Sequence, residues 1–259
     1  MSRIHEPSVE QALVRPRYLA GPGDPAWVTA ALHRASGWSY GHDPLLARVV
    51  LASPDQQALL HLEPEPDQPW WVIRHARTAG TPAWQASFGA RTPAEIIAAF
   101  TDALTDPATP SAGGSPYEPL RDVGWQPARD HSGFTSPDGI VQVEHFTETG
   151  SGTWFIDVAI GGDPVGLIWR AQFGAGTPAH LISAVTRALA DPSPLPRDPE
   201  RSPPLGHDRM HTSIRELPAA DVAFALERRI DALISRSPVP CRSAAPPGPA
   251  VQPRPHRSR

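Results

Sequence analysis

An internal duplication constrains the fold of this 259-residue chain more than any other feature. The segment from Trp84 to Pro107 aligns without a gap on the segment from Trp169 to Pro192. Two shorter motifs upstream also recur, Gly37-Trp38 as Gly124-Trp125 and Ser53-Pro54-Asp55 as Ser136-Pro137-Asp138. Because self-similarity of this kind is the signature of repeated structural units, we expect two homologous units in tandem.

Each copy of the long segment predicts a strand followed by a helix. Trp84, Ala86 and Phe88 alternate with polar residues, which is typical of a half-buried strand. A Thr-Pro pair predicts the start of each helix, with Thr92 as N-cap and Glu95 completing a capping box in the first copy. One face of each helix is apolar, formed by Ile96, Ile97, Phe100 and Leu104 in the first copy and by Leu181, Ile182, Val185 and Leu189 in the second.

Shorter apolar or alternating runs precede each of these segments. They predict strands near residues 45–52, 58–63 and 70–75 in the first unit and near residues 140–146 and 153–160 in the second. The predicted fold class is therefore α+β, with two homologous units, each an antiparallel meander of four or five strands with a C-terminal helix packed on one face.

Proline-rich stretches and changes in composition divide the chain further. A helix that begins near Asp24 lies ahead of the first unit, and a narrow apolar stripe predicts another helix after the second. We expect an N-terminal segment with a helix at 1–36, repeat unit 1 at 37–110, a linker at 111–123, repeat unit 2 at 124–197, a Pro-rich linker at 198–218, a helix at 219–236 and a disordered, basic, Pro-rich tail at 237–259.

Composition narrows the class of protein. The single cysteine, Cys241, cannot form an intramolecular disulfide, which favours a reducing compartment. No run approaches the roughly 18 apolar residues of a membrane helix, and the first residues lack the apolar stretch of a signal peptide, so we expect a cytoplasmic protein with no membrane contact. All 23 basic residues are Arg and the chain has no Asn, which indicates the codon bias of a GC-rich genome rather than phosphate recognition.

The repeated motifs resemble a known family. The run from Pro16 to Asp24, Gly37-Trp38, the Ser-Pro-Asp turns and the Thr-Pro helices are similar to an actinobacterial, streptomycete-type domain of unknown function, number 317, which occurs in tandem copies. The resemblance covers roughly residues 12–198. It implies an actinobacterial source and implies no activity, so no catalytic residue is carried over.

Motifs that suggest catalysis or cofactor binding have simpler explanations. The run Gly21-Pro-Gly-Asp-Pro-Ala26 fits a dinucleotide fingerprint by spacing, but its prolines remove backbone donors that a pyrophosphate needs. Ser87 lacks the glycine that must come two residues before the serine of a nucleophile elbow. We therefore predict no catalytic residue and no cofactor.

The histidines form no obvious cluster. His207 and His211 have a spacing that suits a metal on a helix, but they follow a proline-rich segment and lack the glutamate of a metalloprotease. His61, His75, His131 and His145 fall on or beside strands. We predict no metal site.

Three function classes follow from these observations. The duplication repeats Trp, Phe, Gly and Thr-Pro rather than reactive residues, which favours a non-enzymatic binding or regulatory module with a protein partner. The alternative is a nucleic-acid-associated protein that uses sheet aromatics and the tail, where Arg242, Arg254, Arg257 and Arg259 have no acidic neighbour. Third is an enzyme, which would need a cleft between the repeats that gathers His61, His131 or His145 with carboxylates.

Overall fold

The two repeat units share one antiparallel sheet of ten strands. The computed structural model describes residues 7–41, 48–63, 70–106, 114–128, 132–147, 152–161, 166–201 and 207–236. The first unit contributes β2 (Ser39–Gly41), β3 (Val49–Ala52), β4 (Ala58–Leu62), β5 (Trp71–His75) and β6 (Trp84–Phe88). The second contributes β7 (Gln126–Pro127), β8 (Gly133–Thr135), β9 (Val141–Phe146), β10 (Thr153–Ala159) and β11 (Leu167–Phe173). The strand order is β2-β3-β4-β5-β6-β11-β10-β9-β8-β7, so the α+β prediction with one meander per unit is confirmed.

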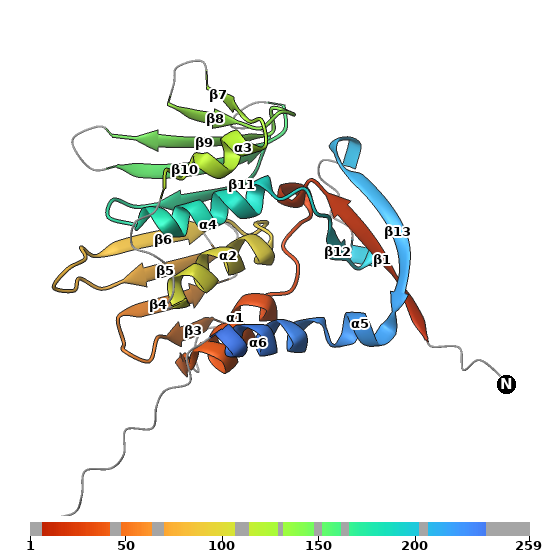
Figure 1. Cartoon of the computed structure of the whole chain (residues 1–259), viewed down its shortest axis with the longest axis horizontal. Coiled ribbons are helices and arrows are strands. Elements are labelled where there is room, and N and C mark those ends of the chain that lie inside the picture. The colour runs from red at the N-terminus through yellow and green to blue at the C-terminus, as the bar shows by residue number, and fades with distance from the viewer. Residues whose placement is uncertain are drawn as a thin grey trace, which may run out of the picture.

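Helices cover one face of this sheet. They are α1 (Ala26–Ser36), α2 (Ala94–Thr105), α3 (Glu118–Asp122), α4 (Ala179–Ala190) and α6 (Ala225–Arg236), and a further short helix, α5 (Ala219–Ala223), lies beyond this sheet (Figure 1). Figure 1 shows α1 to α4 and α6 on the same side of the sheet, and no helix of the described ranges covers the other side. None of these helices is long and apolar enough to cross a membrane.

The strands β6 and β11 join the two units around a pseudo-two-fold axis. Ser87 lies opposite Gln172, and these two residues occupy equivalent positions in the two copies. The flanking hydrogen bonds are also equivalent, because Gly89 N donates to Arg170 O and Gly174 N donates to Gln85 O, both at 2.8 Å. The repeated strands therefore pair with each other in a symmetric register.

The two repeated glycines allow this close pairing. A Cβ on Gly89 would lie 3.4 Å from the backbone of Arg170, and a Cβ on Gly174 would lie 3.2 Å from Gln85 O. The contact at Gly174 is tighter than ordinary packing, so a side chain there would push against the paired strand, whereas the distance at Gly89 is at the lower limit of ordinary van der Waals contact.

Aromatic side chains from both units form the core beneath the axis. The rings of Phe88 and Phe173 meet edge to face with centroids 5.6 Å apart, and Phe100 of α2 lies 5.8 Å and 5.7 Å from them. All three are fully buried, as are the apolar residues Ile96, Ile97, Leu181, Ile182 and Val185 of the paired helices α2 and α4. The predicted inner faces of the repeated strands and helices are thus confirmed.

The predicted caps of the repeated helices are wrong. The Thr92 hydroxyl is buried and has no hydrogen-bond partner among the described residues, and Thr177 Oγ1 donates to Gly174 O instead. The first helical amide, Ala94 N, donates to Pro22 O at 2.8 Å, so the N-terminal segment supplies the acceptor that we expected from the threonine. Glu95 likewise turns away from the cap to bind Arg197.

A second, three-stranded sheet joins the two ends of the described chain. It consists of β12 (Leu195–Arg197), β1 (Ser8–Arg15) and β13 (His211–Pro218) in that order. The segment 198–218 is therefore not only a linker, and α3 likewise lies within the expected linker 111–123. Almost every residue of β13 is exposed, so its sequence carries no alternation of apolar and polar residues that would predict a strand.

The helix expected at 219–236 is divided in two. The α-helical pattern stops at Phe224, whose side chain is 57% exposed, and the chain continues as α6. The predicted apolar stripe contains one fully buried residue, Ile230, which packs where α6 contacts α1.

The N-terminal segment is anchored to the second unit through Tyr18. The Tyr18 hydroxyl donates to Asp138 Oδ2 at 2.5 Å, and Tyr18 O accepts from Trp169 Nε1 at 2.8 Å. Asp138 belongs to a Ser-Pro-Asp turn in which Ser136 Oγ donates to the carboxylate and accepts from Val141 N. The same turn forms in the first unit, where Ser53 Oγ donates to Asp55 Oδ1 at 2.6 Å.

The first prediction concerns the core at the axis. We expect Phe88→Ala or Phe173→Ala to lower the free energy of unfolding by about 3–5 kcal/mol, because each deletion leaves a cavity between the two units. Phe146→Ala is the control, since this side chain is 44% exposed, and we expect a loss below about 1 kcal/mol. Urea unfolding monitored by circular dichroism measures both, and equal losses would contradict the prediction.

The second prediction concerns pH. Burial and the hydrogen bond to Asp138 raise the pKa of Tyr18 far above its usual range. Above about pH 10 the unfolded chain releases the Tyr18 proton while the folded chain keeps it, so stability falls by up to about 1.4 kcal/mol per pH unit. We expect a shallower loss between about pH 9 and about pH 11 in Tyr18→Phe than in wild type, measured by urea unfolding. Parallel stability curves would show that Tyr18 does not contribute.

Candidate binding groove

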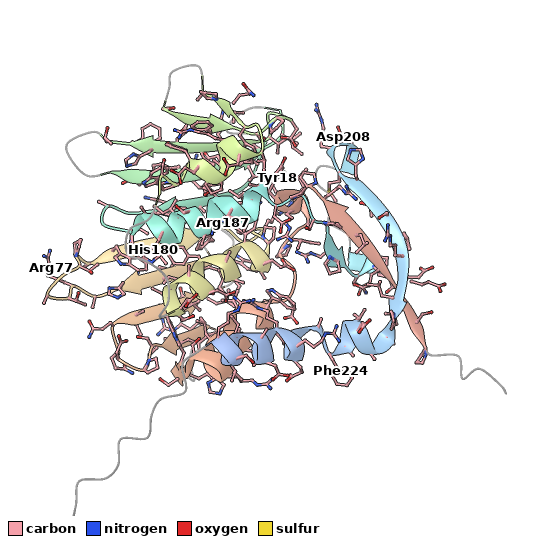
Figure 2. The ribbon with its side chains drawn as sticks, in the orientation of Figure 1. Tyr18, Arg77, His180, Arg187, Asp208 and Phe224 are labelled. Carbon is pink, nitrogen blue, oxygen red and sulfur yellow. The ribbon has the colours of Figure 1, made fainter. Side chains whose placement is uncertain are left out.

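A groove of about 1060 Å³ crosses the helix layer above the pseudo-two-fold axis. The outer faces of α2 and α4 form its floor, α3 lies along one side, and α6 with the two ends of α1 lies along the other. Figure 2 shows His180 and Arg187 along α4, on the side of the sheet that carries the helices.

The floor of the groove repeats the symmetry of the core. Residues at equivalent positions in the two copies line it in pairs, among them Ala99 with Ala184, Glu95 with His180, and Asp102 with Arg187. Because alanine side chains are small, the floor lies close to the helix backbones in both halves. The other two pairs differ in charge, so the floor of the groove is symmetric in shape and asymmetric in charge.

The first half of the groove is closed by α6. Arg229 of α6 binds Asp102 with two hydrogen bonds of 2.7 Å and 3.0 Å, and its guanidinium lies 5.3 Å from the centre of the Trp27 ring. Arg34 of α1 binds Glu227 with two bonds of 2.6 Å, and this hydrogen bonding lowers the pKa of Glu227. The helix is thus held by two Arg-carboxylate pairs on either side of the buried Ile230.

The acidic residue at the start of α2 also has a partner. Arg197 binds Glu95 with bonds of 2.7 Å and 2.8 Å, and it donates to the backbone oxygens of Ala20 and Gly21. The glycine-containing turn therefore presents carbonyl oxygens to a guanidinium. This arrangement is the opposite of a phosphate loop, which presents amides to an anion.

The second half of the groove is open. Arg187 is exposed, and no hydrogen bond or ion pair joins it to any described residue. Burial lowers the pKa of His180, which favours the neutral ring at neutral pH. Ser183 Oγ is buried in the groove without a hydrogen-bond partner in the described part of the chain. At the end of the groove, Arg17 and Asp191 form an ion pair of 2.7 Å.

The histidines named from the sequence lie apart from one another. His61 is on the uncovered face of β4, where burial and the nearby charge of Arg74 lower its pKa. His145 is on the helix side of β9 and stacks on Trp154 at 4.3 Å, and His75 stacks on Trp84. His131 lies outside the described residues. The structure does not bring His61 and His145 together.

The structure also places the residues that the sequence offered for metal binding and for nucleic-acid binding. His211 opens β13, while the short 3-10 turn that contains His207 precedes it, and no group of three or more potential ligands exists within the described ranges. Trp84 and Trp169 are only 5% and 2% exposed, so they pack in the core and cannot stack on bases. The Arg-containing tail at 237–259 lies outside the described residues.

Sequence analysis missed the groove residues Asp102, Arg187 and Arg229. A signal for two of them was present, because Asp102 and Arg187 occupy equivalent positions in the gap-free alignment of the copies and carry opposite charges. The partner Arg229 could not be found in this way, since it comes from outside the duplicated region.

The third prediction tests whether Arg229 holds α6, the wall of the closed half of the groove, against α2. We expect Arg229→Ala to speed hydrogen exchange in α6, because it leaves the partly buried Asp102 without its partner and costs about 1.5–3 kcal/mol of local stability. Arg228→Ala is the matched control, since its pair with Asp221 is more than half exposed, and we expect an effect below about 0.5 kcal/mol. Similar exchange rates in both variants, measured by mass spectrometry, would contradict the assigned role of Arg229.

Comparison with known proteins identifies the repeated unit. The family described as SPDY, a domain of unknown function (DUF317), matches residues 52–110 and residues 135–195. These two ranges contain the Asp residues of the Ser-Pro-Asp turns and the repeated helices α2 and α4. A search of curated proteins and a search of solved structures each found no match. Two segments of the chain therefore match the model of the SPDY domain, DUF317, which is consistent with tandem copies.

Proposed function

We propose that this protein is a non-enzymatic binding module whose groove over α2 and α4 holds a segment of a protein partner. The observation that supports this function best is the groove itself, which both copies build from the outer faces of their repeated helices. Helix packing keeps that floor rigid, because the inner faces of α2 and α4 are buried in the common core.

The shape and chemistry of the groove suit a polypeptide better than a small molecule. Small-molecule sites are usually enclosed and mainly apolar, with a few polar groups that converge. This groove is open in its second half and combines a floor of alanines with charged residues on both sides. Grooves of this kind accept an amphipathic helix, whose apolar face contacts the floor while its polar edges pair with the charges.

The duplication also favours binding over catalysis. Both copies retain the residues that build the strands, the helices and the Ser-Pro-Asp turn. The groove positions that differ between copies change charge, as at Asp102 and Arg187, which alters what is recognised rather than how a reaction proceeds. We therefore place the recognition surface in the groove.

The fourth prediction tests the groove as the binding surface. We expect Ala184→Arg or Ala99→Arg to reduce recovery of the partner at least about tenfold, since a long side chain on the floor blocks close approach. The measurement is affinity capture from a lysate of the source organism after nuclease treatment, with quantitative mass spectrometry.

Gln172→Arg provides the control. It adds the same charge on the uncovered face of the sheet, and we expect it to recover the partner as wild type does. Far-ultraviolet circular dichroism checks that each variant folds. Identical protein recovery by wild type and by both groove variants would rule out this function. A parallel capture without nuclease treatment in which wild type recovers nucleic acid and no protein would also rule it out.

A further inference from the structure

We infer that the groove has a second helix-binding position, related to that of α6 by the pseudo-two-fold axis, and that it takes an amphipathic helix of a partner protein with carboxylates facing Arg187 and Arg121. This inference rests on the proposed function and specifies the partner. It is carried by the position of α6, by the equivalence of α1 and α3, and by the charges in the open half.

The helix α6 shows how this type of surface binds a helix. It lies against α1, buries Ile230 completely, and pairs with Asp102 of α2 and Arg34 of α1 through Arg229 and Glu227. In the first half of the groove a buried apolar residue and two charged contacts thus contribute to seating a helix, together with the contact between Arg229 and Trp27.

The other half has a shorter version of this surface, because α3, with five residues, is the counterpart of α1, with eleven. Each helix ends at a Gly-Trp pair, with φ of 70° at Gly37 and 81° at Gly124. The amide of each Trp bonds back to a carbonyl of its helix, although the spans differ by one residue: Trp38 N donates to Leu32 O at 3.1 Å, and Trp125 N donates to Leu120 O at 3.0 Å. Both Trp rings are buried. In addition α1 packs on α2 as α3 packs on α4, so the helix layer has the same order on each side of the axis.

No described element occupies the position beside α3 that α6 occupies beside α1 (Figure 1). The residues left open there are suited to a contact. Val123 at the end of α3 is 46% exposed, at the position equivalent to Ser36 on the occupied side. Arg187 is exposed on α4, at the position equivalent to Asp102.

The charges select the occupant. In the Gly-Trp alignment Arg121 is equivalent to Arg34, and its exposed guanidinium lies 5.2 Å from the centre of the Phe134 ring, so an incoming helix needs an acidic residue where α6 has Glu227. Arg187 replaces Asp102, so the helix needs a second acidic residue where α6 has Arg229. Glu118 and Asp122 also face the groove from α3 and would accept basic residues elsewhere on that helix.

This requirement excludes two occupants from the chain itself. The α6 of a second copy would place its Arg229 against Arg187. The tail at 237–259 contains Arg242, Arg254, Arg257 and Arg259 and no acidic residue, so it would bring more positive charge to Arg187 and Arg121. A separate partner that supplies the carboxylates is the occupant that fits.

The test uses a peptide of residues 219–236 in two versions, the native sequence and the version with Arg229→Glu. Each peptide is acetylated, amidated and labelled with a fluorophore, and fluorescence anisotropy measures its binding to the full chain. We expect the Arg229→Glu peptide to bind wild type at least about tenfold more tightly than the native peptide. We also expect it to protect amides of α3 and α4, rather than those of α1, from hydrogen exchange.

A charge reversal in the protein provides the decisive control. In the Arg187→Asp chain the preference should invert, so that the native peptide binds at least about tenfold more tightly than the Arg229→Glu peptide. Arg74→Asp, on the uncovered face of β5, should leave the wild-type preference unchanged. Because Arg187 is exposed, Arg187→Gln serves as a milder variant that should abolish the preference without inverting it.

The possible results separate this inference from the proposed function. Equal binding of both peptides, or a preference that ignores Arg187, overturns the second helix position. If groove-dependent capture of a partner persists in that case, the proposed function stands and only the identity of the segment is wrong. If capture does not depend on Ala184 and Ala99 either, both proposals fail.

Discussion

The pairing of β6 with β11 is the interaction on which the rest of this structure depends. A sheet of five strands leaves the backbone groups of its edge strands unpaired, and such edges invite association with other chains. Here the repeated strand of one unit satisfies that of the other, with Ser87 opposite Gln172 at the centre. The duplication thus provides each unit with the partner that its own sequence requires, and the core beneath the junction belongs to both.

The symmetry of the core contrasts with the asymmetry of the helix layer. On one side α1 has eleven residues and is followed outward by α6, whereas α3 on the other side has five residues and carries no further helix in the described ranges. The two halves also differ in charge, because Asp102 of the first copy is replaced by Arg187 at the equivalent position of the second. One half of the helix layer is therefore covered by a helix of the chain itself, and the other half is not covered by any described helix.

The sequence predicted the repeated elements well because the same residues determine them twice. Alternation in the repeated strands and the apolar faces of α2 and α4 are direct consequences of burial, so periodicity reveals them. Strands of two or three residues, such as β2, β7 and β8, are too short for any period to be visible. The strand β13 was missed because it is exposed, and the caps were mispredicted because Pro22 and Arg197 supply contacts from distant parts of the chain. The groove depends on those same long-range contacts, so only the charge change between the copies pointed to it.

The ribbon of β1 and β13 has a consequence for the order in which this molecule is assembled and opened. Its register pairs Ser8 with Pro218, so it joins segments from the two ends of the described chain, and α6 follows it after the short helix α5. Contacts of such high sequence separation carry a large loop-closure entropy and tend to form late in folding. The closed wall of the groove is therefore attached to the element with the highest contact order, while its floor belongs to the central sheet. Local unfolding of the ribbon would release that wall and widen the groove, and the ten-stranded sheet would stay intact.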